Sequence, residues 1–244
     1  MNEQDTVSTH YLDAKGEAYC AGRFDRRMEF GREFQTRYFR SFCGEDKDLL
    51  DFGCATGLFL RALPARQRIG VEVNPHCLRA CRELSEQLGI AIKLHEALDT
   101  VGDECVDVVI SNHVLEHVLN PMRELKHMHR VLRPGGHLVL VTPFDDFRSP
   151  KNRCYDPEDK DHHFFTWSPL NLGNLISEAG FQVDDCRICT TAWSPKIFWV
   201  KKCLGMTAFK LACVLLSVLK QRREVFCSAT KPCGEAASDF SCTK

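Results

Sequence analysis

Residues 49–57 read Leu-Leu-Asp-Phe-Gly-Cys-Ala-Thr-Gly, an apolar run that ends in an acidic residue and a turn of small residues. The run predicts a buried strand over Asp48–Phe52. Small residues at Gly53, Ala55 and Gly57 allow the backbone to approach a ligand very closely. The stretch therefore predicts a strand that leads into a ligand-binding loop.

Strands and helices alternate regularly beyond this loop. Asn74 is a suitable helix N-cap, and Pro75 fits the first position of the helix that follows it. Residues 134–136, Pro-Gly-Gly, stop a helix and lead into another strand. The expected strands are 48–52, 68–73, 90–94, 106–111, 137–142, 181–188 and 224–230, and the expected helices are 58–63, 75–88, 122–132 and 169–179. This rhythm predicts a doubly wound α/β fold, in which helices cover both faces of a parallel sheet.

Composition sets limits on the class of protein. With 244 residues, of which 44% are hydrophobic and 27% charged, the chain has the size and composition of one larger globular domain. The net charge of -1 gives no reason to expect nucleic acid as a partner. The 14 cysteines lack the paired spacing of a zinc ribbon or a disulfide framework. Reduced thiols and a cytoplasmic location are expected, because the first residues carry no apolar signal segment.

The spacing of the loop separates two classes of nucleotide cofactor. A dinucleotide site has the pattern G-x-G-x-x-G, with the pyrophosphate at the helix N-terminus. Here the last glycine, Gly57, comes one position early, and Leu58 occupies its place. The carboxylate of Asp51 would repel a diphosphate but suits a ligand that carries ammonium and sulfonium groups. Glu72, about 20 positions beyond the first glycine, can accept both ribose hydroxyls in either class. A nicotinamide-dependent oxidoreductase is therefore the less favoured alternative.

Four segments together resemble the ordered motifs of class I S-adenosylmethionine-dependent methyltransferases: residues 51–57, Glu72, residues 107–118 and residues 130–138. They are most similar to the small-molecule group that includes the ubiquinone-biosynthesis O-methyltransferases. The resemblance covers roughly residues 48–183. It implies a Rossmann-like, mostly parallel seven-stranded sheet with one antiparallel strand near the C-terminus, and S-adenosylmethionine as the cofactor.

The resemblance also implies a cofactor site. Asp51 and Gly53 would hold the methionine end, Glu72 the ribose, and Glu96-Ala97 would lie beside the adenine. The full set of implied cofactor-binding residues is Asp51, Gly53, Ala55, Gly57, Glu72, Val73, Glu96, Ala97 and Asn112, the last of them near the sulfonium. Ala55 stands where the family has its middle glycine, so we expect the loop to avoid a strongly positive φ there.

Residues 113–117, His-Val-Leu-Glu-His, match the H-x-x-E-H motif that places two zinc-binding histidines on one helical face in some proteases. The motif follows a buried strand within the cofactor-binding array, which disfavours a protease. We expect a histidine pair at the start of a helix, packed against the pocket, and no metal. The alternative is that His113, Glu116 and His117 hold a divalent ion that orients an acceptor hydroxyl. Ubiquinone-pathway enzymes with E-x-x-E-H at this point imply that role, although a histidine in the first position would favour softer metals.

The acceptor side of the site is less sharply defined. Methyl transfer is an in-line displacement for which the protein supplies alignment and, for a hydroxyl acceptor, a base. Histidine titrates near neutral pH, which makes His162, His163 and His113 the candidate bases. His162 and His163 belong to a polar stretch, 143–166, that we interpret as a substrate-side loop; alternatively they only open the next helix. The predicted reaction is methyl transfer to a small-molecule or lipid-linked acceptor at oxygen, with a noncatalytic partner subunit of the same fold as the alternative.

Residues 196–220 form a strongly apolar insertion that contains no acidic residue. Lys210 lies near its middle and the apolar run is short, so a transmembrane helix is disfavoured. It is either a helix that covers the acceptor pocket or a dimer partner, or an interfacial helix that makes peripheral contact with a membrane. The predicted organisation is a helical segment (1–45), a methyltransferase domain (46–231) and a loose tail (232–244), in a monomer or homodimer.

Overall fold

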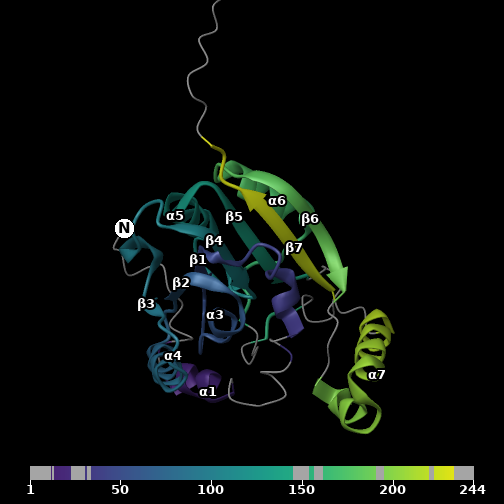
Figure 1. Cartoon of the computed structure of the whole chain (residues 1–244). Coiled ribbons are helices and arrows are strands. Elements are labelled where there is room, and N and C mark those ends of the chain that lie inside the picture. Colours follow the sequence, from purple (N-terminus) through teal and green to yellow (C-terminus); the bar gives the residue numbers. More distant parts are fainter. Residues whose placement is uncertain are drawn as a thin grey trace, which may run out of the picture.

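A single mixed sheet forms the centre of the computed structural model (Figure 1). The structure describes residues 12, 14–22, 31, 34–144, 154–156, 162–190, 195–219 and 223–233. The strands are β1 (Gly44–Phe52), β2 (Ala65–Val71), β3 (Lys93–His95), β4 (Val106–Asn112), β5 (Leu132–Pro143), β6 (Gln182–Thr190) and β7 (Arg223–Thr230). Their order is β3-β2-β1-β4-β5-β7-β6, and β7 runs antiparallel to both β5 and β6 while the other described pairs are parallel. The predicted fold, with one antiparallel strand near the C-terminus, is confirmed.

Helices and short 3-10 turns connect these strands. The helices are α1 (Ala14–Gly22), α3 (Leu58–Ala62), α4 (Pro75–Gln87), α5 (Pro121–Val131), α6 (Pro169–Glu178) and α7 (Phe198–Leu219). The 3-10 turns are η3 (Thr36–Tyr38), η4 (Leu98–Thr100), η5 (Leu115–His117) and η7 (Pro195–Ile197). The predicted cap of α4 is confirmed, because the Asn74 side chain accepts hydrogen bonds from the backbone N–H groups of His76 and Cys77.

The sheet separates two apolar layers. Successive side chains of a strand point to opposite faces, so neighbours such as Leu138 and Val139 in β5 belong to different clusters. One cluster packs under α5 and α6, and the other contains the apolar residues of α3 together with Phe39. Both faces of the central strands are thereby removed from water, which explains why their sequences are almost continuously apolar.

Several predicted boundaries were wrong, and backbone hydrogen bonds explain them. The third strand was expected at 90–94 but is 93–95, because the Ile90 N–H donates to the Ser85 carbonyl and closes the end of α4 instead of joining β2. The fifth strand begins at Leu132, before Pro134-Gly135-Gly136. Backbone hydrogen bonds keep the two glycines in the strand: the Gly135 N–H donates to the carbonyl of Lys231, and the Lys231 N–H donates to the carbonyl of Gly136. Strand β1 begins at Gly44, four residues earlier than expected.

Some predictions fall partly outside the described residues. The helical segment (1–45) and the substrate-side loop (143–166) are described only in part, and the tail (232–244) only to Cys233. Every cysteine in the described part of the chain is a free thiol.

Candidate functional site

The predicted cofactor residues meet at the carboxyl edge of the parallel strands. Asp51 is the second-last residue of β1, and Glu72 follows directly on β2. These two strands pair in register, with Asp51 opposite Gly70 and Phe52 opposite Val71. Carboxyl ends of parallel strands form the ligand-binding edge of open α/β sheets. The sequence was therefore right to place both carboxylates at one end of the fold.

The loop after β1 is held in left-handed backbone conformations. Gly53 has φ 77°, Ala55 has φ 47° and Gly57 has φ 75°. Ala55 was expected to avoid a strongly positive φ; it does enter the left-handed region, at a smaller φ than the two glycines. Its N–H donates to Oε2 of Glu72 over 2.9 Å, and this bond fixes the turn. A left-handed alanine costs about 1–2 kcal/mol, which the surrounding hydrogen bonds must offset.

Gly53 is required for a second reason. A Cβ at this position would lie 2.8 Å from Cγ1 of Val114 and nearer still to its Cγ2. Real Cβ atoms do not approach that closely, so the loop and the segment after β4 can pack together only when residue 53 has no side chain. This contact forms one wall of the pocket.

Glu72 organises the loop as well as facing the pocket. Its Oε2 accepts from Ala55 N and its Oε1 accepts from Asn74 N over 2.8 Å. The side chain is buried, with 8% exposure. Each carboxylate oxygen can accept more than one hydrogen bond, which is the capacity that binding of ligand hydroxyls requires. The arrangement suits a ribose diol.

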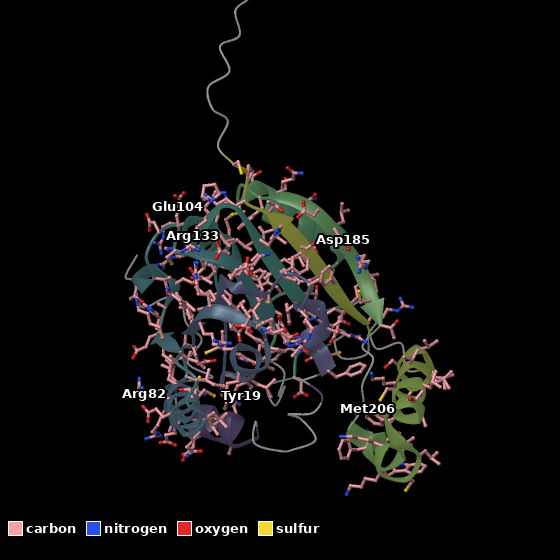
Figure 2. All side chains as sticks on the ribbon, in the orientation of Figure 1. Tyr19, Arg82, Glu104, Arg133, Asp185 and Met206 are labelled. Carbon is pink, nitrogen blue, oxygen red and sulfur yellow. The ribbon has the colours of Figure 1, made fainter. Side chains whose placement is uncertain are left out.

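A pocket at this edge brings together seven of the candidate site residues. Its lining contains the implied cofactor residues Gly53, Glu72, Val73, Glu96 and Ala97, and also His113, Val114 and His117. Tyr19 also lines it from α1 (Figure 2), a contribution that sequence reasoning missed because nothing in the sequence ties α1 to this edge. Asp51, Ala55, Gly57 and Asn112 lie outside the described lining, and Asn112 instead contacts Gln35, Nδ2 to Oε1 over 3.5 Å.

Asp51 has the properties of a buried cation acceptor. It is 1% exposed, and its Oδ2 has no hydrogen-bond partner among the described residues. Burial raises the pKa of Asp51 well above its usual range, and negative charge on Cys81 and Glu72 adds to the shift. A buried carboxylate oxygen without a partner is costly unless a ligand compensates it. Together with the loop, which leaves no room for a Cβ at residue 53, this fits a cofactor with a cationic methionine end.

Binding of S-adenosylmethionine should therefore strengthen as the pH rises. In the free protein Asp51 is protonated below its raised pKa, whereas a cationic ligand needs the carboxylate, so binding releases a proton in that range. Calorimetry at stepped pH from acidic to neutral conditions measures the slope. Asp51→Asn, which cannot ionise, should bind more weakly and should lose that slope. An equal slope in both proteins would assign the titration to another group.

His113 is anchored by a carboxylate from a distant strand. Its Nε2 lies 3.0 Å from Oε1 of Glu224, a residue of β7 that is 2% exposed. Glu224 also accepts from Gln35 Nε2 and from the Tyr38 hydroxyl. His113 directly follows β4 and has φ 57°, so the orientation of its ring depends both on this backbone conformation and on the contact with Glu224. Sequence reasoning missed Glu224 because 111 positions separate it from His113.

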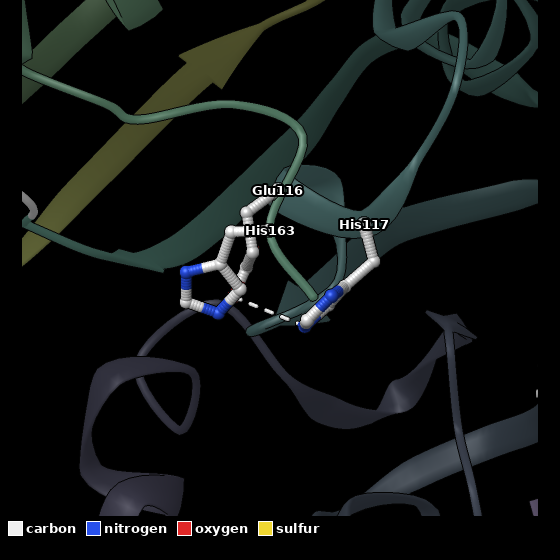
Figure 3. Close-up of side chains that lie close together, drawn as sticks. All are labelled: Glu116, His117 and His163. Atoms are coloured by element: carbon white, nitrogen blue, oxygen red, sulfur yellow. Dashed lines mark ion pairs between the residues drawn. The ribbon is translucent and has the colours of Figure 1, made fainter. Parts of the chain in front are cut away.

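The H-x-x-E-H motif is not helical. The segment turns at His113 and forms only the 3-10 turn η5, so the expected start of an α-helix is wrong and the disfavoured protease geometry does not form. Both histidines line the pocket, as expected. Figure 3 shows what the turn brings together instead: Glu116, His117 and His163, whose possible ligand atoms lie within 4.8 Å of one another. Oε1 of Glu116 lies 3.8 Å from His117 Nε2 and 3.7 Å from His113 Nδ1.

Hydrogen bonding fixes how His117 faces this cluster. Its Nδ1 lies 3.3 Å from the carbonyl oxygen of His162, which can only accept, so Nδ1 carries the proton and Nε2 presents a lone pair toward Glu116. Burial lowers the pKa of His117 to about 4, with a further contribution from His163, which keeps the ring neutral. Two imidazoles, one carboxylate and a backbone carbonyl behind the His117 ring are the donor set of a transition-metal site. The residues therefore fit a divalent ion, with His163 in the set where the sequence suggested His113.

Known proteins resemble this chain in sequence and in fold. A family model described as a methyltransferase domain matches residues 24–185. Ribosomal protein L11 methyltransferase of Yersinia pseudotuberculosis serotype O:1b is 34% identical over 100 residues, 38% of this chain and 33% of that protein. Ubiquinone biosynthesis O-methyltransferase of Ruegeria pomeroyi is 34% identical over 128 residues, 50% of this chain and 47% of that protein. A SAM-dependent methyltransferase from Aquifex aeolicus has the same fold, with a TM-score of 0.58, 14% identity and coverage of 88% of this chain and 98% of that one.

The matched region includes the loop, Glu72 and the lining residues of the pocket except Tyr19. The chain thus belongs to the class I S-adenosylmethionine-dependent methyltransferase family, and S-adenosylmethionine is the cofactor that the family binds. These two curated relatives are matched over less than half of their own length. Their substrates differ by name, so the acceptor of this chain is a separate question.

Proposed function

We propose that the protein transfers the methyl group of S-adenosylmethionine to a hydroxyl oxygen of a small-molecule or lipid-linked acceptor. The observation that carries this proposal is the place of His113, which lines the same pocket as the implied cofactor residues and is oriented by a buried glutamate. Similarity to an O-methyltransferase of ubiquinone biosynthesis supports an oxygen acceptor.

The reaction needs one proton acceptor. The acceptor oxygen forms a bond to the methyl carbon as the bond from carbon to sulfur breaks, and the hydroxyl proton must leave to a base. When the Nε2–H of His113 donates to Glu224, its Nδ1 is the atom that accepts the proton. The negative charge of Glu224 then stabilises the imidazolium that forms, as a buried carboxylate does for the histidine of a catalytic triad.

The remaining histidines have supporting roles in this proposal. The carbonyl of His162 orients His117, and the ring of His163 packs on that of His117 with centroids 4.8 Å apart. A divalent ion, where bound, would be held by Glu116, His117 and His163 and would supply Lewis acidity that favours ionisation of the acceptor hydroxyl.

A labelled-transfer experiment tests the function. The purified protein is incubated with isotopically labelled S-adenosylmethionine and with an extract of the cells from which it comes, and mass spectrometry follows the label in the lipid and aqueous fractions. We expect one labelled compound with the methyl group on oxygen. Label on nitrogen or carbon would contradict the oxygen acceptor, and a protein that binds the cofactor but labels nothing would be a noncatalytic partner subunit.

Replacing the base should affect turnover more than binding. With the acceptor identified in this way, His113→Ala should lower kcat by about 100-fold or more, the usual contribution of a general base. Affinity for the cofactor should stay within about threefold, because the methionine and ribose contacts are unchanged. His76→Ala, a substitution of another partly exposed histidine, on α4, is the control. Equal kcat values in the two variants would remove His113 from the mechanism.

A further inference from the structure

Helix α7 presents a wide apolar face to solvent. In its second part, every fourth residue is buried: Phe209, Cys213 and Ser217. The opposite side is apolar as well, and its side chains are about half exposed or more: Leu211, Val214, Leu215, Val218 and Leu219. Monomeric soluble proteins seldom leave so continuous an apolar surface uncovered.

The first part of α7 and the kink extend this surface. Trp199 and Leu204 are 60% and 67% exposed, and Met206, labelled in Figure 2, lies just beyond the kink. Gly205 has φ 80° and ψ -178°, so α7 consists of two helical arms, residues 198–204 and 206–219. Figure 1 shows α7 beside the main body, next to the end of the sheet where β6 stops and β7 starts.

Topology excludes a simple membrane crossing, although α7 is long and apolar enough to be a candidate span. Thr190 at the end of β6 pairs with Arg223 at the start of β7, so both ends of the excursion are fixed side by side in one sheet. A single crossing would place them on opposite sides of a bilayer. The longer arm measures about 21 Å at 1.5 Å per residue, which is less than the roughly 30 Å of hydrocarbon. The geometry fits a helix that lies in the interface and returns to the side from which it came.

The charge of this segment is of one sign. Residues 195–219 contain four lysines and no acidic residue. Lys196 is exposed in η7, just before α7, and Lys202 is exposed in the first arm. Lys210 is exposed in the second arm, where its Nζ lies 5.7 Å from the centre of the Phe34 ring. An apolar face bordered by lysines, with a tryptophan among its exposed residues, is the pattern of an interfacial helix on an anionic membrane.

The position of α7 relates this surface to the pocket. Glu224, the second residue of β7, pairs with Pro143 at the end of β5, so α7 leaves the sheet from the edge that carries the cofactor site. Glu224 is also the residue that orients His113. A membrane bound at α7 would therefore lie on the acceptor side of the protein.

We propose that α7 binds the surface of a membrane that contains anionic lipids, with both arms in the plane of the interface and their exposed apolar side chains in the headgroup region. The lysines supply attraction to the lipid phosphates, and the apolar side chains supply most of the binding energy. The surface lies apart from the cofactor pocket, so it can be tested even if the proposed transfer reaction is wrong.

Co-sedimentation with vesicles tests this inference on the full chain. Two vesicle types are compared, phosphatidylcholine alone and phosphatidylcholine mixed with phosphatidylglycerol, each at low and high salt. The protein should partition into the anionic vesicles, and high salt should weaken but not abolish binding. Leu211→Asp combined with Leu215→Asp should weaken partitioning by about tenfold or more. Lys196→Glu combined with Lys202→Glu should remove most of the preference for anionic vesicles.

A matched pair of substitutions controls for added charge. Leu88→Asp combined with Leu170→Asp changes two leucines that are 59% and 75% exposed outside α7, and should leave partitioning unchanged. Thermal melting and cofactor binding confirm that each variant is folded. Wild-type protein that stays in the supernatant, or a Leu211/Leu215 variant that partitions like wild type, would overturn the proposal. So would a lipid-free dimer that only the Leu211/Leu215 variant disrupts, since the face would then be an interface between two copies of the chain.

Discussion

Glu72→Ala should weaken binding of S-adenosylmethionine by about one to two orders of magnitude. The variant loses the acceptor for the ribose hydroxyls and also the hydrogen bonds from the backbone of Ala55 and Asn74. Because those two bonds hold the loop and the start of α4 together, the pocket should be less well ordered before any ligand arrives. Calorimetry with the purified variant gives the affinity directly.

The ribose assignment makes this loss specific. S-adenosylhomocysteine has the same ribose, so Glu72→Ala should weaken binding of both compounds by the same factor. Glu86→Ala is the matched control, since Glu86 is an exposed glutamate of α4 outside the pocket lining and should change affinity by less than about threefold. A Glu72 variant with wild-type affinity would refute the assignment.

Gly53→Ala should destabilise the protein by about 2–4 kcal/mol and weaken cofactor binding by more than about tenfold. The new methyl group would have to adopt φ 77° and overlap the side chain of Val114. The loop can avoid the overlap only by moving away from the segment after β4, which opens the wall of the pocket. Chemical denaturation and calorimetry measure the two effects on the same sample.

A second glycine separates strain from overlap. Gly89 has φ 65°, but a Cβ there would meet nothing within 4 Å, so Gly89→Ala should cost only about 1–2 kcal/mol and leave binding intact. Adding Val114→Ala to Gly53→Ala should recover part of the lost stability, because it removes the overlapping methyl groups. If Gly53→Ala and Gly89→Ala were equally mild, close packing of the loop on Val114 would not be a requirement.

Local sequence signals predicted most of the fold. The apolar strands, the Asn74-Pro75 helix start and the glycine loop each depend on a few neighbouring residues, and each was found in the expected order, although several strand ends differ. The edge strand β3 was misplaced because the hydrogen bond from the Ile90 N–H to the Ser85 carbonyl makes residue 90 part of the end of α4 and not of the strand. The residue types at such a boundary are compatible with either structure, so the sequence pattern does not determine where the helix ends and the strand begins.

The site was predictable on its cofactor side and much less so on its acceptor side. The glycine loop and the two carboxylates follow directly on the adjacent strands β1 and β2, so the sequence pattern of those strands locates them. The partners of His113 and Glu116, in contrast, come from β7 and from the segment before α6. These contacts join residues that are far apart in sequence and leave no periodic pattern. The left-handed conformation of Ala55 was missed for a related reason, since its cause is a hydrogen bond to Glu72.

Direct binding of the cofactor tests the central claim, that the carboxyl edge of β1 and β2 forms a site for a cationic nucleoside. Calorimetric titration of the purified protein with S-adenosylmethionine and, separately, with NADH makes the comparison. The account predicts saturable binding of S-adenosylmethionine that Asp51→Asn and Glu72→Ala both weaken, with no heat of binding for NADH. Saturable binding of NADH by a protein that ignores S-adenosylmethionine would contradict it.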